Sequence, residues 1–372
     1  MALNIWTGFH WCSPVNANNN AMAEESLQKV ARWGAVILVS SVDTSSNPNA
    51  QDESFVDACN QVMNARDAVG GGRSLDQSIA RVYFATACSP SLSDVSSVSQ
   101  ADSWLKTNGY YNSLNYFVAN GGRSCVIFNE LNQGGSGQSC SSPGAEPQYG
   151  ADPRVIGYLG YALVNAYYNQ GNRQLYVLVP GPTGLMPDDG TAWYNGFLNY
   201  FAHYDLWTPN NVVQTFGQVY GNQVDPLLQN RTMLHHGGTG VFDRIALHCY
   251  AHSPSQDPGG LGNATVSGNP ALQYIQWFIQ GVDASEWIYL TECGGSVEYD
   301  DYSEGVAVAQ FQYNVSSLNA QSLSAGGFGG LVQAAYGYIL DISNAGASRG
   351  GIDRVSCHAT DGYNYERGVL DF

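Results

Sequence analysis

The chain has 372 residues and a formal net charge of −17, from 14 Lys and Arg against 31 Asp and Glu. This acidic balance repels phosphate backbones and anionic lipids, so the sequence predicts no nucleic-acid partner and no membrane partner. Hydrophobic residues make up 44% and charged residues only 12%, which predicts a buried core under an uncharged, hydrogen-bonding surface suited to neutral ligands such as sugars.

Eight short apolar runs recur along the chain and are predicted to be strands. They are nearly continuous rather than alternating, which is typical of strands buried on both faces of a parallel sheet. In chain order the runs are Asn4–Trp11, Ala35–Ser41, Arg81–Ala87, Ser124–Glu130, Leu175–Pro180, Arg244–Tyr250, Ile288–Glu292 and Gly330–Tyr336.

Helical patterns lie between the predicted strands. In Glu53–Ala68 apolar residues recur on one face, and Asp152-Pro153 supplies an N-cap and a proline in the first turn of a second helix. The same start signal occurs at Asn269-Pro270, and Ser303–Leu323 reads as a long helix. Strand followed by helix, at a period of roughly forty residues, predicts βα units joined by right-handed crossovers.

Eight such units most simply close into a (β/α)8 TIM barrel of the α/β class, forming a single domain over residues 1–372. The interval Met186–Thr239 is long and predicts elaborated βα loops, and the low-complexity stretch Gln133–Gly150 predicts a mobile rim after the fourth strand. The tail Leu340–Phe372 shows no helical stripe and is expected to be irregular.

The eight cysteines form no CxxC pair, which argues against a zinc ribbon or a thioredoxin-type site. Their even number permits disulfides, and Cys125–Cys140 is the local candidate. Free cysteines packed as small buried hydrophobes are the alternative.

Two carboxylates end predicted strands four and seven. A carboxylate is costly to bury at the end of an apolar strand unless it is paired or functional. Strands four and seven of an eight-stranded barrel are nearly opposite, so Glu130 and Glu292 are expected to face each other across the mouth. Retaining glycoside hydrolysis needs two carboxyl groups roughly 5–5.5 Å apart.

These residues resemble the retaining glycoside hydrolases of clan A, the superfamily that includes cellulases and β-mannanases. In that superfamily strand four ends in Asn-Glu, strand six often ends in His-x-Tyr, and strand seven ends in the nucleophilic Glu. The chain carries the three motifs in order, as Asn129-Glu130, His248-Cys249-Tyr250 and Thr291-Glu292-Cys293-Gly294. The resemblance covers nearly the whole predicted barrel in register.

The resemblance implies a role for each matching residue. Glu130 would be the acid/base and Glu292 the nucleophile, while Asn129 would bind the sugar 2-hydroxyl. His248 and Tyr250 would hold the nucleophile and the sugar at the cleavage point.

The chain departs from the superfamily pattern at several positions. Leu131 stands where proline usually follows the acid/base, and Cys293 replaces the usual aromatic residue after the nucleophile. Strand eight offers Gln333 and Tyr336 as substrate-binding residues in place of a tryptophan, and the superfamily's strand-two arginine has no certain counterpart.

Other side chains are weaker candidates for substrate binding. His10 ends the first predicted strand, where it could reach a sugar or pack under a loop. Trp193, Trp207 and Trp104 could each stack on a sugar ring, although a single tryptophan is more often part of a core.

No metal and no cofactor are expected. His235-His236 has no third ligand at metal-binding spacing and lies in a Gly-rich loop. The acidic run Glu298–Asp301 after strand seven reads as a solvated face, with calcium binding as the alternative.

The sequence therefore predicts a retaining glycosidase that cleaves β-linked neutral poly- or oligosaccharides by double displacement. We expect a secreted, extracellular monomer whose signal peptide is not within this chain, because Met1–Trp11 lacks the charged and apolar regions of a signal. One alternative is a catalytically inactive carbohydrate-binding or virion-associated barrel. Another is a barrel of different chemistry, such as a lyase or a metal-dependent hydrolase.

Overall fold

The computed structural model describes twelve stretches of the chain, which include eight strands of one sheet. The described stretches are residues 6–11, 36–42, 48–76, 78–82, 90–127, 152–169, 174–180, 214–234, 239–242, 244–250, 287–294 and 332–340. The eight strands are β1 (Trp6–Trp11), β2 (Val36–Val42), β3 (Ile79–Val82), β4 (Ser124–Ile127), β5 (Tyr176–Pro180), β8 (Arg244–Tyr250), β9 (Trp287–Gly294) and β10 (Val332–Leu340).

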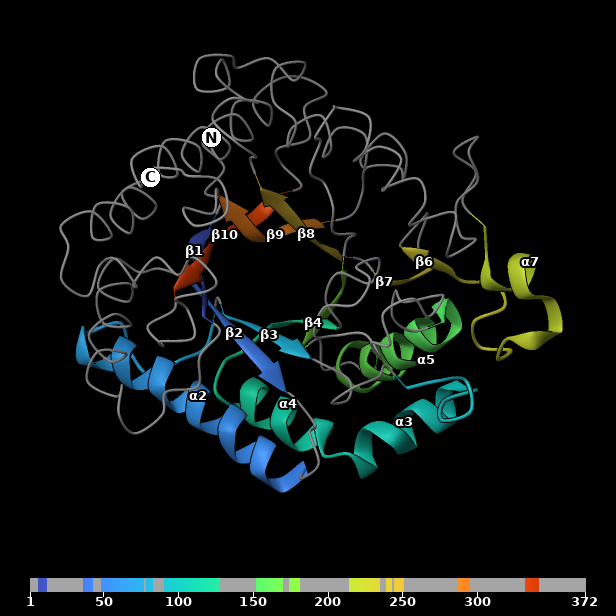
Figure 1. Ribbon diagram of the computed structural model, residues 1–372, viewed down its shortest axis with the longest axis horizontal. Coiled ribbons are helices and arrows are strands. Elements are labelled where there is room, and N and C mark those ends of the chain that lie inside the picture. The colour runs from blue at the N-terminus through green and yellow to red at the C-terminus, as the bar shows by residue number, and fades with distance from the viewer. Residues whose placement is uncertain are drawn as a thin grey trace, which may run out of the picture.

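These strands form a closed parallel sheet in the order β1-β10-β9-β8-β5-β4-β3-β2, because β1 pairs with both β10 and β2. Figure 1 shows the strands as a ring with helices outside it. Each of the eight predicted strands overlaps a strand of this sheet, and the bounds of the sixth, Arg244–Tyr250, are those predicted, whereas the third, predicted over Arg81–Ala87, shares only Arg81 and Val82 with β3. β3 begins at Ile79, two residues before its predicted start, and β10 continues four residues beyond its predicted end at Tyr336.

Four helices described between β2 and β5 lie outside the sheet (Figure 1): α2 (Pro48–Ala68), α3 (Val98–Thr107), α4 (Tyr110–Ala119) and α5 (Pro153–Val164). The predicted helix Glu53–Ala68 is confirmed within α2, and the predicted start of α5 is confirmed because the Asp152 side chain accepts a hydrogen bond from the backbone N–H of Arg154. A π-helical turn, η1 (Asn165–Asn169), continues α5. No helix in the described stretches has the length and hydropathy to span a bilayer.

The interval between β5 and β8 carries extra structure, as its length predicted. It contains the short helix α7 (Phe216–Tyr220), the 3-10 turn η2 (Gly221–Gln223) and a two-stranded parallel sheet of β6 (Thr232–Leu234) and β7 (Gly240–Phe242). We call residues 214–242 the insertion. It packs on α5, where Gly157 and Gly160 lie so close to aromatic rings of the insertion that a Cβ at either position would overlap them.

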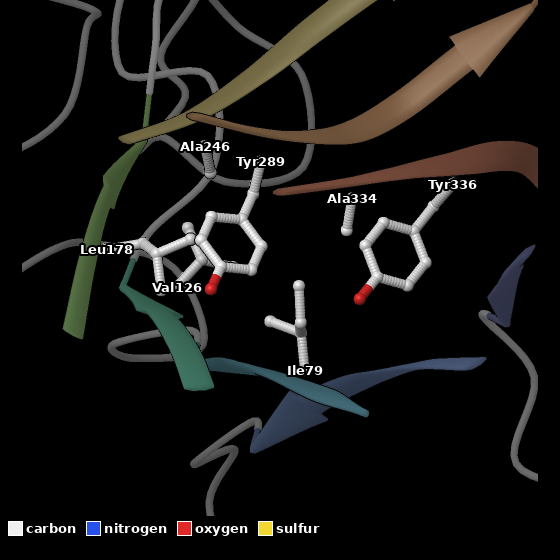
Figure 2. Close-up of a cluster of buried hydrophobic side chains, with 7 residues drawn as sticks. All are labelled: Ile79, Val126, Leu178, Ala246, Tyr289, Ala334 and Tyr336. Atoms are coloured by element: carbon white, nitrogen blue, oxygen red, sulfur yellow. The ribbon is translucent and has the colours of Figure 1, made fainter. Parts of the chain in front are cut away.

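The interior of the closed sheet is filled by side chains. Figure 2 shows a buried cluster to which six consecutive strands of the sheet contribute. The rings of Tyr289 and Tyr336 lie across this interior (Figure 2), and burial raises the pKa of both hydroxyls. The members of the cluster are Ile79, Val126, Leu178, Ala246, Tyr289, Ala334 and Tyr336.

The Cys125–Cys140 disulfide is wrong. Cys125 is a free, fully buried thiol in β4, and burial raises its pKa. Its neighbour Val126 lines the interior in Figure 2, so alternation along the strand places Cys125 on the outer face, under the helices. Packing as a small hydrophobe, the alternative interpretation, accounts for it.

Several predicted segments lie outside the described residues. These are the helix beginning at Asn269-Pro270, the helix Ser303–Leu323, the rim Gln133–Gly150 and the tail that follows Leu340.

Candidate active site

Irregular register marks the carboxyl end of the barrel. β2 has one more residue than β3 between the pairs Val39–Ala80 and Val42–Val82. β9 and β10 likewise gain a residue against their neighbours near their carboxyl ends. Extra residues of this kind, β-bulges, are common at barrel rims and beside active sites, where they redirect side chains. Active sites of (β/α) barrels lie at the carboxyl end, where the irregularities of β2, β9 and β10 described above are found, while one further irregularity lies at the amino end of β10, between Val332 and Ala334.

The bulge in β9 determines the position of Glu292. Leu247 of β8 pairs with Leu290 of β9, but the next residue, His248, pairs with Glu292 rather than with Thr291. Ala246 lines the barrel interior in Figure 2, and His248 stands two residues further along the same strand. His248 and its register partner Glu292 therefore occupy inner-face positions of the sheet.

The other neighbour of β9 shows the same extra residue. Leu290 pairs with Ala335 and Cys293 pairs with Gly337, so only Tyr336 of β10 stands opposite both Thr291 and Glu292. Two independent pairings thus place the bulge at the same point of β9. The motifs predicted on strands six and seven therefore lie side by side. Two residues beyond His248, toward the carboxyl end of β8, Tyr250 pairs with Gly294.

A buried arginine stands below this rim. Arg81 is the penultimate residue of β3 and is only 1% exposed. It lies two residues beyond Ile79, which points into the interior in Figure 2, so Arg81 is on the inner face toward the carboxyl end. The buried polar side chains of the described residues include two arginines and no carboxylate. Arg81 therefore places a buried positive charge on the inner face near this rim, and a positive charge favours the ionised form of a carboxylate close to it.

The second buried arginine, Arg244, lies at the amino end of the barrel. Arg244, the first residue of β8, donates a hydrogen bond from Nη1 to the Tyr289 hydroxyl at 2.5 Å. Its guanidinium lies 3.3 Å from the centre of the Tyr176 ring, and the Ser124 hydroxyl is also hydrogen-bonded to Tyr289. Arg244, Tyr176 and Ser124 all begin strands, so this network belongs to the amino end. Buried polar groups at that end of a barrel usually serve stability.

Sequence reasoning did not find Arg81 as a site residue. The predicted third strand began at Arg81, which placed this residue at the amino terminus of the strand. The two apolar residues before it, Ile79 and Ala80, were the available signal: a strand that starts at Ile79 puts Arg81 on the same face as an apolar side chain.

The structure places some predicted site residues in the barrel and others outside the described residues. The backbone of His10 is near the carboxyl end of β1, in register with Tyr338 and Leu38. With His248, Tyr250 and Glu292 it belongs to the carboxyl-end rim. Glu130, Asn129, Trp193 and Trp207 lie outside the described residues, the first of them three positions after the end of β4.

The remaining aromatic and amide candidates occupy other positions. Tyr336 is 1% exposed and lies in the interior cluster rather than at the end of β10. Gln333 is the second residue of β10, at the amino end of the strand, and its position favours a structural role. Trp104 is half-buried on α3 and stacks on Tyr110 with ring centres 5.3 Å apart, which supports the packing interpretation.

The described stretches contain no group of three or more His, Cys, Asp or Glu side chains that could hold a metal ion. The pair His235-His236 lies outside them.

No family model and no curated protein matches the chain. Among solved structures it is similar to a family 5 glycoside hydrolase from Prevotella bryantii, at 11% identity over 99% of this chain and 95% of that one, with a TM-score of 0.49. A rice β-glucosidase is 11% identical over 90% and 89%, with a TM-score of 0.48. A β-glucosidase from Exiguobacterium marinum is 11% identical over 87% and 78%, with a TM-score of 0.47. At these sequence identities and TM-scores, the similarity supports no conclusion about the chemistry of this chain.

Proposed function

We propose that this chain is a retaining β-glycosidase that acts on a neutral β-linked glycan, built as a single (β/α)8 domain over residues 1–372. The observation that carries the proposal is the bulge in β9, which pairs Glu292 with His248 on the inner face at the carboxyl end of the barrel. Bulges often redirect side chains beside active sites. A bulge next to Glu292 at the carboxyl end of the barrel therefore favours a catalytic role for this carboxylate over a structural one.

In the proposed mechanism Glu292 attacks the anomeric carbon and Glu130 protonates the leaving oxygen. Glu130 then removes a proton from the water that hydrolyses the glycosyl-enzyme. Asn129 binds the 2-hydroxyl, where hydrogen bonds strengthen in the transition state, and His248 and Tyr250 orient Glu292 and the sugar. His10 and the tryptophans Trp193 and Trp207 are proposed to line the substrate channel.

The composition supports a neutral polymer or oligomer as the substrate. With a net charge of −17, the chain repels anionic glycans, whereas a surface rich in tyrosine and amides suits uncharged hydroxyl groups. We propose that the enzyme is an extracellular monomer that needs no cofactor.

The test is reducing-sugar release from a panel of β-glucans, β-mannans, xylan, galactans and chitin. We expect release from one substrate class, with the anomeric configuration of the first product retained when it is followed by NMR. Inversion of configuration would contradict the double-displacement mechanism. Tight binding without release would instead support the alternative, an inactive carbohydrate-binding barrel, and chelator-sensitive release would support a metal-dependent hydrolase.

Replacing Arg81 with methionine should move the acid limb of the pH profile of kcat/KM upward by about one pH unit. The buried guanidinium favours the ionised form of a nearby carboxylate, and the nucleophile must be ionised to attack. Without that positive charge the carboxylate keeps its proton to a higher pH, so activity is lost at a higher pH on acidification. The measurement is kcat/KM between pH 3 and 8.

The matched control for Arg81→Met is Arg244→Met, which removes a buried guanidinium from the opposite end of the barrel. Arg244→Met should alter thermal stability but shift the acid limb far less. Equal shifts in the two variants would contradict a local effect of Arg81.

A further inference from the structure

The insertion contains the sequence Asn-Arg-Thr, at Asn230, Arg231 and Thr232. Asparagine followed two residues later by serine or threonine, with no proline between them, is the acceptor sequence for N-linked glycosylation of exported proteins. Two further sequences of this kind, at Asn263 and Asn314, lie outside the described residues. Asn230 is therefore the acceptor asparagine whose surroundings the structure shows.

The backbone on both sides of Asn230 is held in tight turns. The N–H groups of Gln229 and Arg231 donate to the carbonyl groups three residues earlier, at 3.4 and 2.9 Å. The carbonyl groups of the same two residues accept hydrogen bonds from Gly217 and Phe216, at the start of α7. Asn230 thus stands between two fixed neighbours, and its own side chain is exposed.

The other two residues of the acceptor sequence face the protein. The guanidinium of Arg231 lies 4.6 Å from the centre of the Tyr161 ring and donates to the carbonyl groups of Leu227 and Gly240. Thr232 is 4% exposed, within β6. Only the asparagine of the sequence projects into solvent. Because the threonine hydroxyl is part of the recognised sequence, the transferase must read it before β6 forms.

An exposed leucine lies on the same side of the turns as Asn230. Leu227 is 54% exposed, and among the described residues it is the large hydrophobic side chain that remains in contact with solvent. Side chains three residues apart lie one above the other where the backbone bonds to the residue three positions earlier, as it does here. A sugar chain on Asn230 would cover Leu227, and the insertion lies outside the ring of strands in Figure 1.

We infer that Asn230 is an N-glycosylation site that receives an oligosaccharide during export, an inference that rests on the proposed extracellular location. In the transfer, Nδ2 of Asn230 bonds to the anomeric carbon of the first sugar of an oligosaccharide carried on a lipid diphosphate. The bond from that carbon to the diphosphate oxygen breaks, and the lipid diphosphate leaves with the electron pair. Nδ2 gives up one proton to the transferase.

The test is export of the full chain, behind a cleavable signal sequence, from a cultured eukaryotic cell. We expect a glycan on Asn230. Enzymatic release in water enriched in heavy oxygen converts the acceptor to labelled aspartate, which peptide mapping locates. Asn230→Gln should remove this glycan and leave kcat/KM unchanged, because the insertion lies outside the closed sheet. Recovery of an unmodified Asn230 from the exported chain would overturn the inference.

The matched control is Asn222→Gln, which changes another exposed asparagine of the insertion that is not followed by serine or threonine two residues later. This variant should carry the same glycan on Asn230 as the wild type. Thr232→Val should abolish that glycan, whereas Thr232→Ser, which retains the hydroxyl, should keep it. A glycan that persists on Asn230 in Thr232→Val would contradict modification through this sequence.

A second measurement does not require a folded or exported protein. In cell-free translation with microsomal membranes, a chain with Asn263 and Asn314 both replaced by glutamine should gain mass that a glycosidase removes. Adding Asn230→Gln to that chain should abolish the gain. No gain in the chain that retains Asn230 would also overturn the inference.

The exposed leucine provides a separate readout of what the glycan does. Enzymatic removal of the glycan should increase aggregation on heating, and Leu227→Ser should cancel the increase. An equal increase in Leu227→Ser would show that the glycan does not cover this side chain. A glycan on Asn230 of a chain that hydrolyses no glycan would support this inference and reject the proposed function. Hydrolysis by a chain whose Asn230 is never modified would do the reverse.

Discussion

Glu292→Gln should lower kcat/KM on the hydrolysed glycan by a factor on the order of 10⁴ or more, with the protein still folded. Glutamine has nearly the same shape as glutamate but cannot attack the anomeric carbon. The β9 bulge should persist, because it depends on the backbone register and not on this charge. Initial rates and the melting temperature of the same preparation measure the two effects separately.

The companion variant, Glu130→Gln, distinguishes nucleophile from acid/base. On a glycan it should lose roughly 10²- to 10⁴-fold, the usual range for general acid–base catalysis. On an aryl glycoside whose leaving group needs no proton the loss in the first step should be much smaller, whereas Glu292→Gln should stay inactive. If Glu292→Gln retained activity on both substrates, Glu292 would not be the nucleophile and the assignment of the site would fail.

Gly160→Val should destabilise the folded chain by about 3 kcal/mol, because the new side chain would overlap the ring of Phe242. Phe242 is fully buried in β7, so its ring has no free space into which to move. The absence of a side chain at Gly160 allows α5 to approach the insertion closely. Thermal or denaturant unfolding monitored by circular dichroism measures the loss.

Two further variants test the cause of that destabilisation. Ala119→Val adds the same branched shape at an exposed position of α4 and should cost about 0.5 kcal/mol through helix propensity alone. Combining Gly160→Val with Phe242→Ala should cost less than the sum of the two single changes, because removal of the ring makes room. Strict additivity would show that the two residues are not in contact and would contradict the docking of the insertion on α5.

The helix α3, which lies between β3 and β4, begins with a sequence motif from which it could have been predicted. Neither α3 nor α4 was predicted, although Ser97 and Gln100 have the spacing of an N-cap motif. In the structure the backbone N–H of Gln100 donates to the Ser97 hydroxyl, and the Gln100 side chain accepts from Ser96. The cap is local, so it could have been read from the sequence.

Local patterns alone determined the strands, the presence of a helix over Glu53–Ala68 and the start of α5. A strand buried on both faces must be apolar along its whole length, and a helix must satisfy its first N–H groups, so both leave marks in consecutive residues. The order of the strands followed from the repeated βα unit, because right-handed crossovers leave few ways to arrange a parallel sheet. The rim positions of His10, His248 and Glu292 followed from the same pattern.

Only the tertiary structure decided the features that depend on neighbouring strands. The enclosure of Arg81 requires the sheet to close, and the free thiol of Cys125 requires helices on the outer face. The bulge at Thr291 exists only in relation to the registers of β8 and β10. Register is a relation between chain segments far apart in sequence, which no local pattern in one of them contains. The sequence therefore identified Glu292 as a candidate nucleophile, and the closed sheet determined which face of β9 Glu292 occupies.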